Sequence, residues 1–379
     1  MKKVLVFGAT IKLSLEKQTG IMKKVLAQAK VFESAFDVYT WGFGENEILY
    51  VHDGKVTIVD HFKNKLDRRT KYFTALTRFV LEKQAQAFYF RYASADFYLL
   101  KALKRFQKKG ILSVIEIPSY PYKGEFMHGI KKRMIYLLDS MLRSRLKKYV
   151  SRVVIFVENP KSIYGIPCIN TMNGIDTSDS AAVHSTPADT LNLIAVASML
   201  PHHGFDRMIE GLNQYYYFQQ NDAQSIVFHV VGNGPELKGY QNLAEKCGLE
   251  KHIKFYGQKS GRELDEVFEK ADIAVGSLGL HRIGLTESST LKNREYAVRG
   301  LPIVYATYEL FLKDSPYALE LPANDTPVDM EEVLKFWNRM KTVDYLHEKI
   351  RSDAVSRCDM KVTMAPVVRY LQNNIKQRN

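Results

Sequence analysis

The sequence predicts an α/β fold built from two doubly wound domains, and three observations support this. Apolar runs of strand length alternate with segments of helical periodicity, as expected where helices cover both faces of parallel sheets. The 379 residues exceed what one hydrophobic core normally serves, and 46% of them are apolar, which suffices for two cores. Turn-forming residues cluster between residues 170 and 188, so we expect the domain boundary there.

The first half of the chain contains the strands expected for one sheet. These strands are predicted at residues 4–7, 37–41, 48–52, 55–59, 87–91, 112–117 and 153–157. Asp53-Gly54 separates two of them, and this pair is typical of a tight turn, so residues 48–59 are interpreted as a hairpin. Residues 130–149 are predicted to be one helix with an apolar stripe formed by Met134, Leu137, Leu138, Met141, Leu142 and Leu146.

The second half repeats the alternation. Strands are predicted at residues 191–197, 225–231, 252–256, 272–276 and 302–305. Between the first two strands, a helix that packs on the sheet is predicted from the i, i+3, i+4, i+7 spacing of Phe205, Met208, Ile209 and Leu212.

Composition narrows the functional class. Cys168, Cys247 and Cys358 are scattered and lack metal-ligand spacing, so neither a disulfide framework nor a zinc site is expected. No apolar run approaches the roughly 18 residues that a membrane span needs, and the N-terminus does not resemble a signal peptide, so we expect a cytoplasmic protein.

Charge is divided unevenly between the two halves. Residues 1–180 hold 31 Lys and Arg against 16 Asp and Glu, whereas residues 181–379 hold 23 against 25. The basic half suits an anionic membrane surface or a polyprenyl-diphosphate acceptor, although solvated outer faces of ordinary helices would give the same pattern. Nucleic acid is not expected as a partner, because no RNP-like aromatic pattern, Cys/His finger or arginine-rich tail accompanies the charge.

The segment from Glu287 to Glu295 carries the clearest chemical signal. It follows a predicted buried strand, and Ser288, Ser289 and Thr290 are residue types that cap helices, so a helix should begin between the two glutamates. The N-terminus of that helix would offer unpaired N–H groups to a diphosphate, while the carboxylates accept hydrogen bonds from sugar hydroxyls. The segment therefore predicts a sugar-nucleotide site.

This segment, followed by Gly300-Leu-Pro302, resembles the E-x7-E signature of retaining glycosyltransferases of the GT-B fold, specifically family 4. Further similar motifs are Asn173-Gly-Ile-Asp176, the strand that ends at Ser198, His203-Gly204-Phe-Asp206, Gly232-Asn-Gly234 and the strand that ends at Gly257. The resemblance implies two Rossmann-like domains facing a cleft, with a C-terminal helix that crosses back to the first domain. It places the acceptor-binding domain at residues 1–175 with 356–379, and the nucleotide-sugar-binding domain at 176–355.

The resemblance also implies roles for individual residues of the donor site. Glu295 is expected to hold the ribose hydroxyls, and Glu287 to contact the transferred sugar and stabilise the reacting centre. The N–H groups of Ser289, Thr290 and Leu291 are expected to bind the diphosphate. Close approach of the chain to the nucleotide is expected at Gly232 and beside Gly204, and Gly20 resembles a glycine that lies under the diphosphate.

The chain departs from the common family pattern at two donor-site positions. Ser198 and His203 stand where many relatives have Arg and Lys. We expect His203 to donate a hydrogen bond to the diphosphate and to become protonated beside it, with Lys292, Arg294 or Arg282 restoring the missing charge. The alternative for His203 is a structural loop histidine at the entry to a helix.

On the acceptor side, residues 114–125 stand where many relatives place a histidine that faces the transferred sugar. Glu116 ends a predicted strand and is expected to orient or deprotonate an acceptor hydroxyl, which makes it the second catalytic candidate beside Glu287. Tyr120, Tyr122 and Glu125, together with Arg91 at the end of another strand, are expected to line the acceptor site. The alternative is a rigid structural corner whose tyrosines pack inward.

The expected activity is transfer of a hexose-type sugar, with retention, from a nucleoside-diphosphate sugar to a lipid-linked glycan of surface polysaccharide. No cofactor and no metal are expected, since the chain has no Asp-x-Asp motif suited to a donor diphosphate. The enzyme is expected on the inner face of the cell membrane as a peripheral protein. A glycosyltransferase for a protein or soluble acceptor, and a catalytically silent GT-B partner or glycan-binding subunit, are the alternatives.

Overall fold

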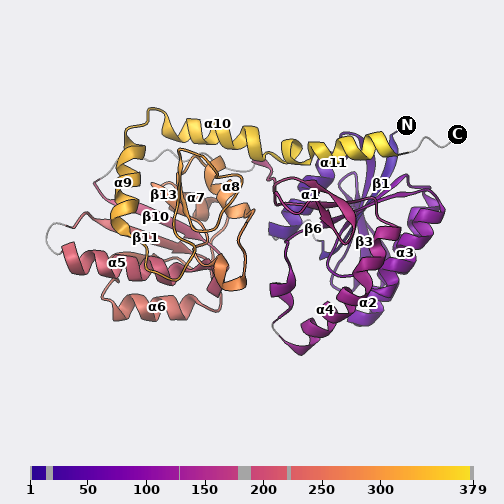
Figure 1. Ribbon diagram of the computed structural model, residues 1–379, viewed down its shortest axis with the longest axis horizontal. Helices are drawn as coiled ribbons and strands as arrows, with labels where there is room; N and C mark the ends of the chain where they lie inside the picture. Colours follow the sequence, from indigo (N-terminus) through magenta and orange to yellow (C-terminus); the bar gives the residue numbers. More distant parts are fainter. Residues whose placement is uncertain (1, 14–19, 128, 178–188, 220–222, 376–379) are drawn as a thin grey trace. The chain divides into compact units, whose positions relative to one another are not determined.

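The chain folds into two compact units in the computed structural model (Figure 1), which describes residues 2–13, 20–127, 129–177, 189–219 and 223–375. Unit 1 comprises residues 1–176 and 360–379, and unit 2 comprises residues 177–359. The two crossings between the units are thus at Asp176/Thr177 and Asp359/Met360.

Unit 1 is built on a nine-stranded sheet of order β4-β3-β2-β1-β5-β6-β7-β9-β8. Its strands are β1 (Lys3–Lys12), β2 (Phe36–Phe43), β3 (Glu47–His52), β4 (Lys55–His61), β5 (Ala87–Arg91), β6 (Leu112–Ile117), β7 (Arg152–Ile155), β8 (Ser162–Ile163) and β9 (Ile166–Asn170). The pairs β1/β2, β1/β5, β5/β6, β6/β7 and β7/β9 are parallel, whereas β2/β3, β3/β4 and β8/β9 are antiparallel. The hairpin predicted at residues 48–59 is confirmed, with Asp53 and Gly54 at φ +46° and +71° in its turn.

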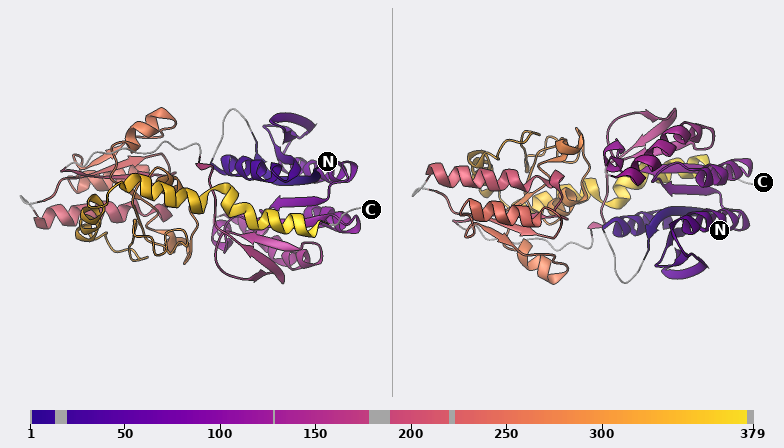
Figure 2. Two further views of the ribbon diagram at one scale, coloured as in Figure 1. Left: turned by 90° about the horizontal axis from the view of Figure 1, so that it is seen from above. Right: turned by 90° about the horizontal axis from the view of Figure 1, so that it is seen from below.

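Helices cover both faces of this sheet. They are α1 (Gly20–Glu33), α2 (Lys65–Glu82), α3 (Phe97–Lys108), α4 (Ile130–Leu142) and α11 (Met360–Asn374), with 3₁₀ turns η1 (Lys123–Phe126) and η2 (Arg143–Lys148). Alternate residues of β1 point to opposite faces: Leu5 and Phe7 pack in the core beneath α1 and α11, and Val6 packs in the core beneath α2 and α3. The C-terminal helix α11 lies beside α1 (Figure 2), so the last segment of the chain completes the first domain.

Unit 2 has a six-stranded, fully parallel sheet of order β12-β11-β10-β13-β14-β15. Its strands are β10 (Leu191–Val196), β11 (Ile226–Val231), β12 (Ile253–Phe255), β13 (Ile273–Val275), β14 (Ile303–Tyr305) and β15 (Ala318–Glu320). Its helices are α5 (Phe205–Gln219), α6 (Leu237–Lys246), α7 (Arg262–Phe268), α8 (Leu291–Val298), α9 (Met330–Lys341) and α10 (Leu346–Cys358), with 3₁₀ turns η4 (Pro201–His203) and η6 (Leu280–Ile283). The four apolar residues that predicted α5 are all fully buried.

Two predictions of local structure were wrong. Residues 130–149 form not one helix but α4 followed by the 3₁₀ turn η2, and the predicted apolar stripe splits between the two faces. Leu142 and Leu146 are buried and Leu138 packs against the core, whereas Met134, Leu137 and Met141 are exposed. The second error is that three short strands, β8, β9 and β15, were not predicted. None of them has a strong apolar run.

Candidate active site

The candidate donor site lies in unit 2, where the strands of the sheet end and their loops meet. The loops after β10 and β13 are joined, because the Leu278 N–H donates to the His203 carbonyl oxygen over 2.9 Å. Gly204, at φ +65°, lies so close to this second loop that an added Cβ would be 2.6 Å from the Gly279 nitrogen. Ligands bind parallel α/β sheets at this edge, where the strand order reverses between β10 and β13.

The structure gives a reason of its own for the glycine at position 232, which follows β11. An added Cβ would lie 1.9 Å from the Ala197 carbonyl oxygen, and the residue adopts φ +130°. The protein itself therefore excludes a side chain here, without any need for a nucleotide to approach. The backbone at Gly232 is further held by its N–H, which donates to the Gly257 carbonyl over 2.7 Å.

The start of α8 is fixed against the end of β10. The buried Tyr296 hydroxyl accepts from the Val196 N–H over 2.8 Å, so it ties the helix to that strand. Thr290 occupies the N-cap position with extended backbone, but its hydroxyl does not cap the helix. The hydroxyl donates instead to Glu309 over 3.1 Å, and Thr290 therefore leaves the helix N-terminus to other acceptors.

Glu309 is the residue around which this loop and helix are assembled. Its carboxylate is fully buried and accepts from Ser288 Oγ, Thr290 Oγ1, Asn293 Nδ2 and Arg294. It was not among the predicted site residues. Glu309 lies four residues beyond β14 in an irregular segment, and no periodicity in the sequence marks it as buried.

Lys292 is the cation that the structure places at the sheet edge. Its Nζ lies 3.1 Å from His203 Nδ1, and Ser277 Oγ lies 3.1 Å from the same nitrogen. These three side chains come from α8, η4 and the loop after β13, so they bring together the segments that follow β10 and β13. Burial lowers the pKa of Lys292 to about 7, although Glu295 and Glu309 act in the opposite direction.

His203 is therefore not the protonated group that we expected. Burial, with the neighbouring charges of Lys292 and His202, lowers the pKa of His203 to about 2, so the imidazole is neutral at physiological pH. It accepts through Nδ1 from the Lys292 ammonium and hydrogen-bonds to the backbone of Ser198. His203 thus positions the cation, and Lys292 carries the charge.

The other two candidate cations are held by carboxylates. Arg294 is fully buried, pairs with Glu309, and donates to the Thr290 carbonyl over 2.7 Å and to Ser289 Oγ over 2.9 Å. Arg282 forms a bidentate ion pair with Asp206 and donates a further hydrogen bond of 2.7 Å to Asp325. The hydrogen bonds to these carboxylates raise the pKa of Arg282. Both arginines are structural in this arrangement.

The remaining predicted donor residues of unit 2 lie on α8, in the loop before it and beyond the end of β10. Glu295 is exposed on α8 and Glu287 is half-buried in the preceding loop. Ser198 is exposed beyond the end of β10, and Ser289 and Leu291 are half-buried at the start of α8. In sequence, Glu287 precedes the first turn of α8 and Glu295 follows it, and that turn also carries Lys292.

In unit 1, Glu116 is not a group open to an acceptor. Its carboxylate is fully buried; it pairs with Arg91 and with Lys24 at 3.7 Å, and accepts from Tyr89 Oη and Gln28 Nε2 at 2.7 Å each. Burial alone would raise the pKa of Glu116, but the two cations and the hydrogen bonds lower it. The expectation that Glu116 acts as a catalytic base is therefore wrong for this structure; it holds Arg91.

Arg91 faces a cavity of about 370 Å³ at the carboxyl ends of β1, β5 and β6. The cavity is lined by Thr10, Ile11, Ile21, Arg91, Tyr92, Ala93, Ile117, Pro118, Ser119, Tyr122 and Phe126. Its walls are largely apolar with one guanidinium, and its position at the carboxyl edge is where α/β domains bind ligands. This is the candidate acceptor site within unit 1.

The two predicted acceptor-side tyrosines pack inward. Tyr122 is buried, lines the cavity with its ring, and donates to Asp139 Oδ2 over 2.8 Å. Tyr120 is half-buried against the core. The side chain of Glu125 lies outside the described residues. At Gly20, the first residue of α1, an added Cβ would meet nothing within 4 Å, so the fold itself leaves that space open.

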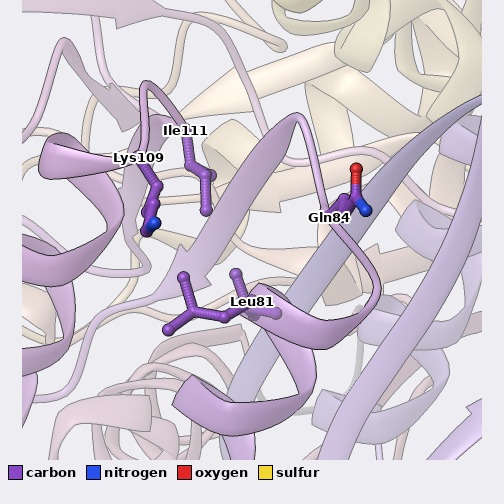
Figure 3. Close-up of a pocket in the computed structure, with 5 residues that line it drawn as sticks. Leu81, Gln84, Lys109 and Ile111 are labelled. Carbon is purple, nitrogen blue, oxygen red and sulfur yellow. The ribbon is translucent and has the colours of Figure 1, made fainter.

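A second cavity of unit 1, of about 320 Å³, lies at the opposite edge of the sheet (Figure 3). Val80, Leu81, Gln84, Lys109 and Ile111 line it, at the amino ends of β5 and β6. Lys109 is its sole charged lining residue, and the cavity is remote along the strands from Arg91. We therefore exclude it from the candidate active site.

Within the described residues, no group of three or more His, Cys, Asp and Glu side chains is arranged to hold a metal ion. No helix of the described part of the chain is both long and apolar enough to cross a membrane.

Comparison of the sequence with protein families identifies one similarity. Residues 176–312 match the family described as Glycosyl transferases group 1, a span that contains β10 to β14 and the α8 segment. No curated protein is similar to the chain in sequence.

Solved structures resemble the whole chain. Sucrose-phosphate synthase from Thermosynechococcus elongatus has a TM-score of 0.69 at 11% identity, over 98% of this chain and 100% of that one. A glycosyltransferase from Rickettsia africae has 0.66 at 11%, over 100% of both chains. Anabaena HepE in complex with UDP has 0.66 at 12%, over 98% and 100%. The fold is GT-B. The predicted α/β architecture of two parallel-sheet domains is confirmed, and identities this low establish the fold alone.

Proposed function

We propose that this GT-B protein is a retaining glycosyltransferase of family 4, which moves a hexose-type sugar from a nucleoside-diphosphate sugar to a lipid-linked glycan. The observation that carries the proposal is Lys292 in the first turn of α8, with its ammonium directed to the sheet edge by His203 and with Glu287 and Glu295 on either side in sequence. Glu287 and Glu295 fit the E-x7-E pattern.

The donor half of the proposal assigns a task to each group. The Lys292 ammonium and the N–H groups at the start of α8 bind the diphosphate, since a helix N-terminus and a lysine both favour anions. Glu295 accepts from ribose hydroxyls and Glu287 from the transferred sugar. The similar fold of Anabaena HepE, solved with UDP and with UDP-glucose, supports a nucleotide-sugar donor.

The reaction that these groups support is a front-face displacement. The bond between the anomeric carbon and the diphosphate breaks, and the acceptor oxygen forms a new bond to that carbon on the same face. Negative charge develops on the departing phosphate oxygen, which takes the proton of the acceptor hydroxyl. Lys292 and the α8 N–H groups stabilise the leaving group by preorganised electrostatics, which is usually the largest single catalytic contribution. No covalent nucleophile takes part, and we propose that transfer needs no metal and no cofactor.

The acceptor half rests on unit 1. The 370 Å³ cavity, with Arg91 on an otherwise largely apolar lining, offers a site for a saccharide next to a phosphate-bearing carrier. The excess of positive charge in residues 1–180 favours a polyprenyl-diphosphate carrier at the inner face of a membrane, where the protein would be peripheral. A lipopolysaccharide outer core galactosyltransferase, WaaB, has a similar fold, with a TM-score of 0.61 at 14% identity.

The test is thermal stabilisation of the purified protein by a panel of nucleoside diphosphates, applied to the wild type, Glu295→Ala and Lys292→Gln. A ligand at about 100 times its dissociation constant adds about 2.7 kcal/mol of stability. We expect a response to one base, lost or weakened in both variants and retained in Glu269→Ala, which changes an exposed glutamate of α7's C-terminal end. The absence of any response would favour the silent-partner alternative.

Product and rate measurements then test the stereochemistry, the independence of metal and the class of acceptor. Retention is checked by the anomeric coupling constant of the product in NMR, and an inverted anomer would refute it. Activity that is abolished by chelation and restored by Mn²⁺ would refute metal independence. Equal rates on a soluble sugar acceptor and on a lipid-linked acceptor would favour the protein or soluble-acceptor alternative.

A further inference from the structure

Helix α4 of unit 1 carries an apolar stripe on its outer side. Ile130, Met134, Leu137 and Met141 expose 78%, 65%, 63% and 66% of their surface. Successive residues of an α-helix are turned by about 100°, so these four side chains lie within about 60° of one another. Single exposed apolar residues are ordinary, but a stripe that runs the length of a helix indicates a binding surface.

The orientation of α4 is fixed by its other side. Asp139, which lies opposite the stripe, is fully buried and accepts from the Ala95 N–H over 2.7 Å and from Tyr122 Oη over 2.8 Å. Tyr92 Oη donates to the same carboxylate. Rolling the helix to bury the stripe would break these bonds and leave a buried carboxylate without donors, so the apolar residues stay outside.

Positive charge borders the stripe. Exposed cations of α4 and η2 are Lys131, Lys132, Arg133, Arg145, Lys147 and Lys148. The sole acidic residue between 130 and 148 is the buried Asp139, so α4 and η2 carry a large excess of positive charge. An apolar stripe bordered by Lys and Arg is the pattern of a helix that lies in the interface of an anionic bilayer.

We infer that α4 and η2 form a membrane-anchoring surface that inserts the stripe into the interface of a bilayer rich in anionic phospholipid. A second copy of the chain is a poorer occupant, because pairing two stripes would bring two such cation clusters together. The inference concerns unit 1 alone.

The anchoring surface is connected to the candidate acceptor cavity. Tyr122 lines the cavity and bonds to Asp139 of α4, and the ring of Phe126, which also lines it, lies 5.9 Å from that of Tyr136 of α4. A bilayer under α4 therefore lies next to the cavity wall. The next step rests on the proposed function. The carrier lipid of the acceptor stays in the bilayer while its saccharide reaches Arg91.

The test is co-flotation of the full-length protein with vesicles of phosphatidylcholine and phosphatidylglycerol at 7:3, against vesicles of phosphatidylcholine alone. Binding is expected to the first and to weaken in 1 M salt, where the Debye length falls to about 3 Å. Lys131→Gln/Lys132→Gln/Arg133→Gln is expected to bind roughly 100-fold more weakly, since each cation near the surface contributes about fivefold. Met134→Asp/Leu137→Asp is expected to lose at least about tenfold, because charged groups replace inserted side chains.

Matched controls use exposed residues elsewhere on unit 1. Lys101→Gln/Lys104→Gln/Lys108→Gln removes as many cations from α3, and Leu66→Asp replaces an apolar residue of α2 that is 70% exposed. Both controls are expected to bind as the wild type does. Equal loss in controls and α4 variants would overturn the inference, as would absence of vesicle binding by the wild type.

Two further outcomes would overturn it. A wild-type dimer that Met134→Asp/Leu137→Asp converts to a monomer in light scattering would assign the stripe to a second copy. A marked loss of thermal stability in that variant would show that the stripe packs within the protein. Nucleotide stabilisation is measured on the same samples: its persistence without vesicle binding would refute only the anchor, and its absence with vesicle binding would refute only the donor site.

Discussion

Donor binding should depend on pH through Lys292. Burial lowers the pKa of this ammonium to about 7, and the bound diphosphate would favour the protonated form. The protonated fraction of the free enzyme falls from about one half at pH 7 to about 3% at pH 8.5, so the apparent dissociation constant should rise by about 16-fold. The range begins at pH 7 because the terminal phosphate, with a second pKa of about 6, is already ionised there.

The assay is isothermal titration calorimetry with the nucleoside diphosphate that stabilises the protein most. Titrations at pH 7 in two buffers of different ionisation enthalpy should reveal uptake of about half a proton per ligand bound. Lys292→Gln should bind weakly at every pH, with no uptake. Lys292→Arg should lose the pH dependence while keeping a cation, because a guanidinium stays protonated throughout this range.

A wild-type affinity that stays constant between pH 7 and 8.5 would refute the assignment of Lys292 as the diphosphate ligand. The same conclusion would follow if Lys292→Gln retained the wild-type slope, since another group would then be titrating. Uptake of a full proton at pH 7 would mean that Lys292 is almost fully deprotonated before the ligand binds, which would place its pKa well below 7, and the rise in the apparent dissociation constant between pH 7 and 8.5 would then exceed about 16-fold.

Three further predictions concern the residues that hold the two sites. Glu309→Gln should lower the free energy of unfolding by about 3–5 kcal/mol in urea denaturation, because it leaves Arg294 buried without its counter-charge, while Glu269→Gln should change it by less than about 0.5 kcal/mol. Glu116 has a lowered pKa, so its contribution to stability is present above the unfolded pKa of about 4.3 and is lost as pH falls further; Glu116→Gln should remove this acid-side dependence from unfolding curves between pH 3 and 6. Gly232→Ala should destabilise the fold by more than about 1 kcal/mol, because its Cβ meets the Ala197 carbonyl; a wild-type Tm in this variant would contradict that prediction. Gly20→Ala should fold normally, and it should lower kcat/KM if a substrate lies against Gly20.

The sequence predicts the sheets well because their strands are apolar runs with consistent local signals. The order of elements, the hairpin at residues 48–59 and the helix that begins at Phe205 could all be read from patterns of two to eight residues. The short strands β8, β9 and β15 could not, because their pairing depends on neighbours distant in sequence. The periodicity of residues 130–149 indicated an apolar stripe, but it could not show which of its members would be buried.

The site was harder to predict than the fold, since burial decides what each ionisable residue does. His203 was an expected cation, but packing against Phe205 and Lys292 leaves it neutral. Glu116 was an expected base, but Lys24 and Arg91 hold it within the core. Glu309 and Asp139 were missed altogether, because a carboxylate in an irregular segment or in a basic helix gives no sequence signal of burial.

In the proposed donor site, Lys292 supplies the cation that Ser198 and His203 do not. A lysine on a loop would need ordering when the ligand binds, whereas Lys292 belongs to the first turn of a helix already fixed at Tyr296 and through Asn293 to Glu309. Its charge and the N–H donors of the same turn therefore form one preordered group. Burial disfavours that charge when no anion is near, and a bound diphosphate would offset this cost, so the proposed donor site would favour anions.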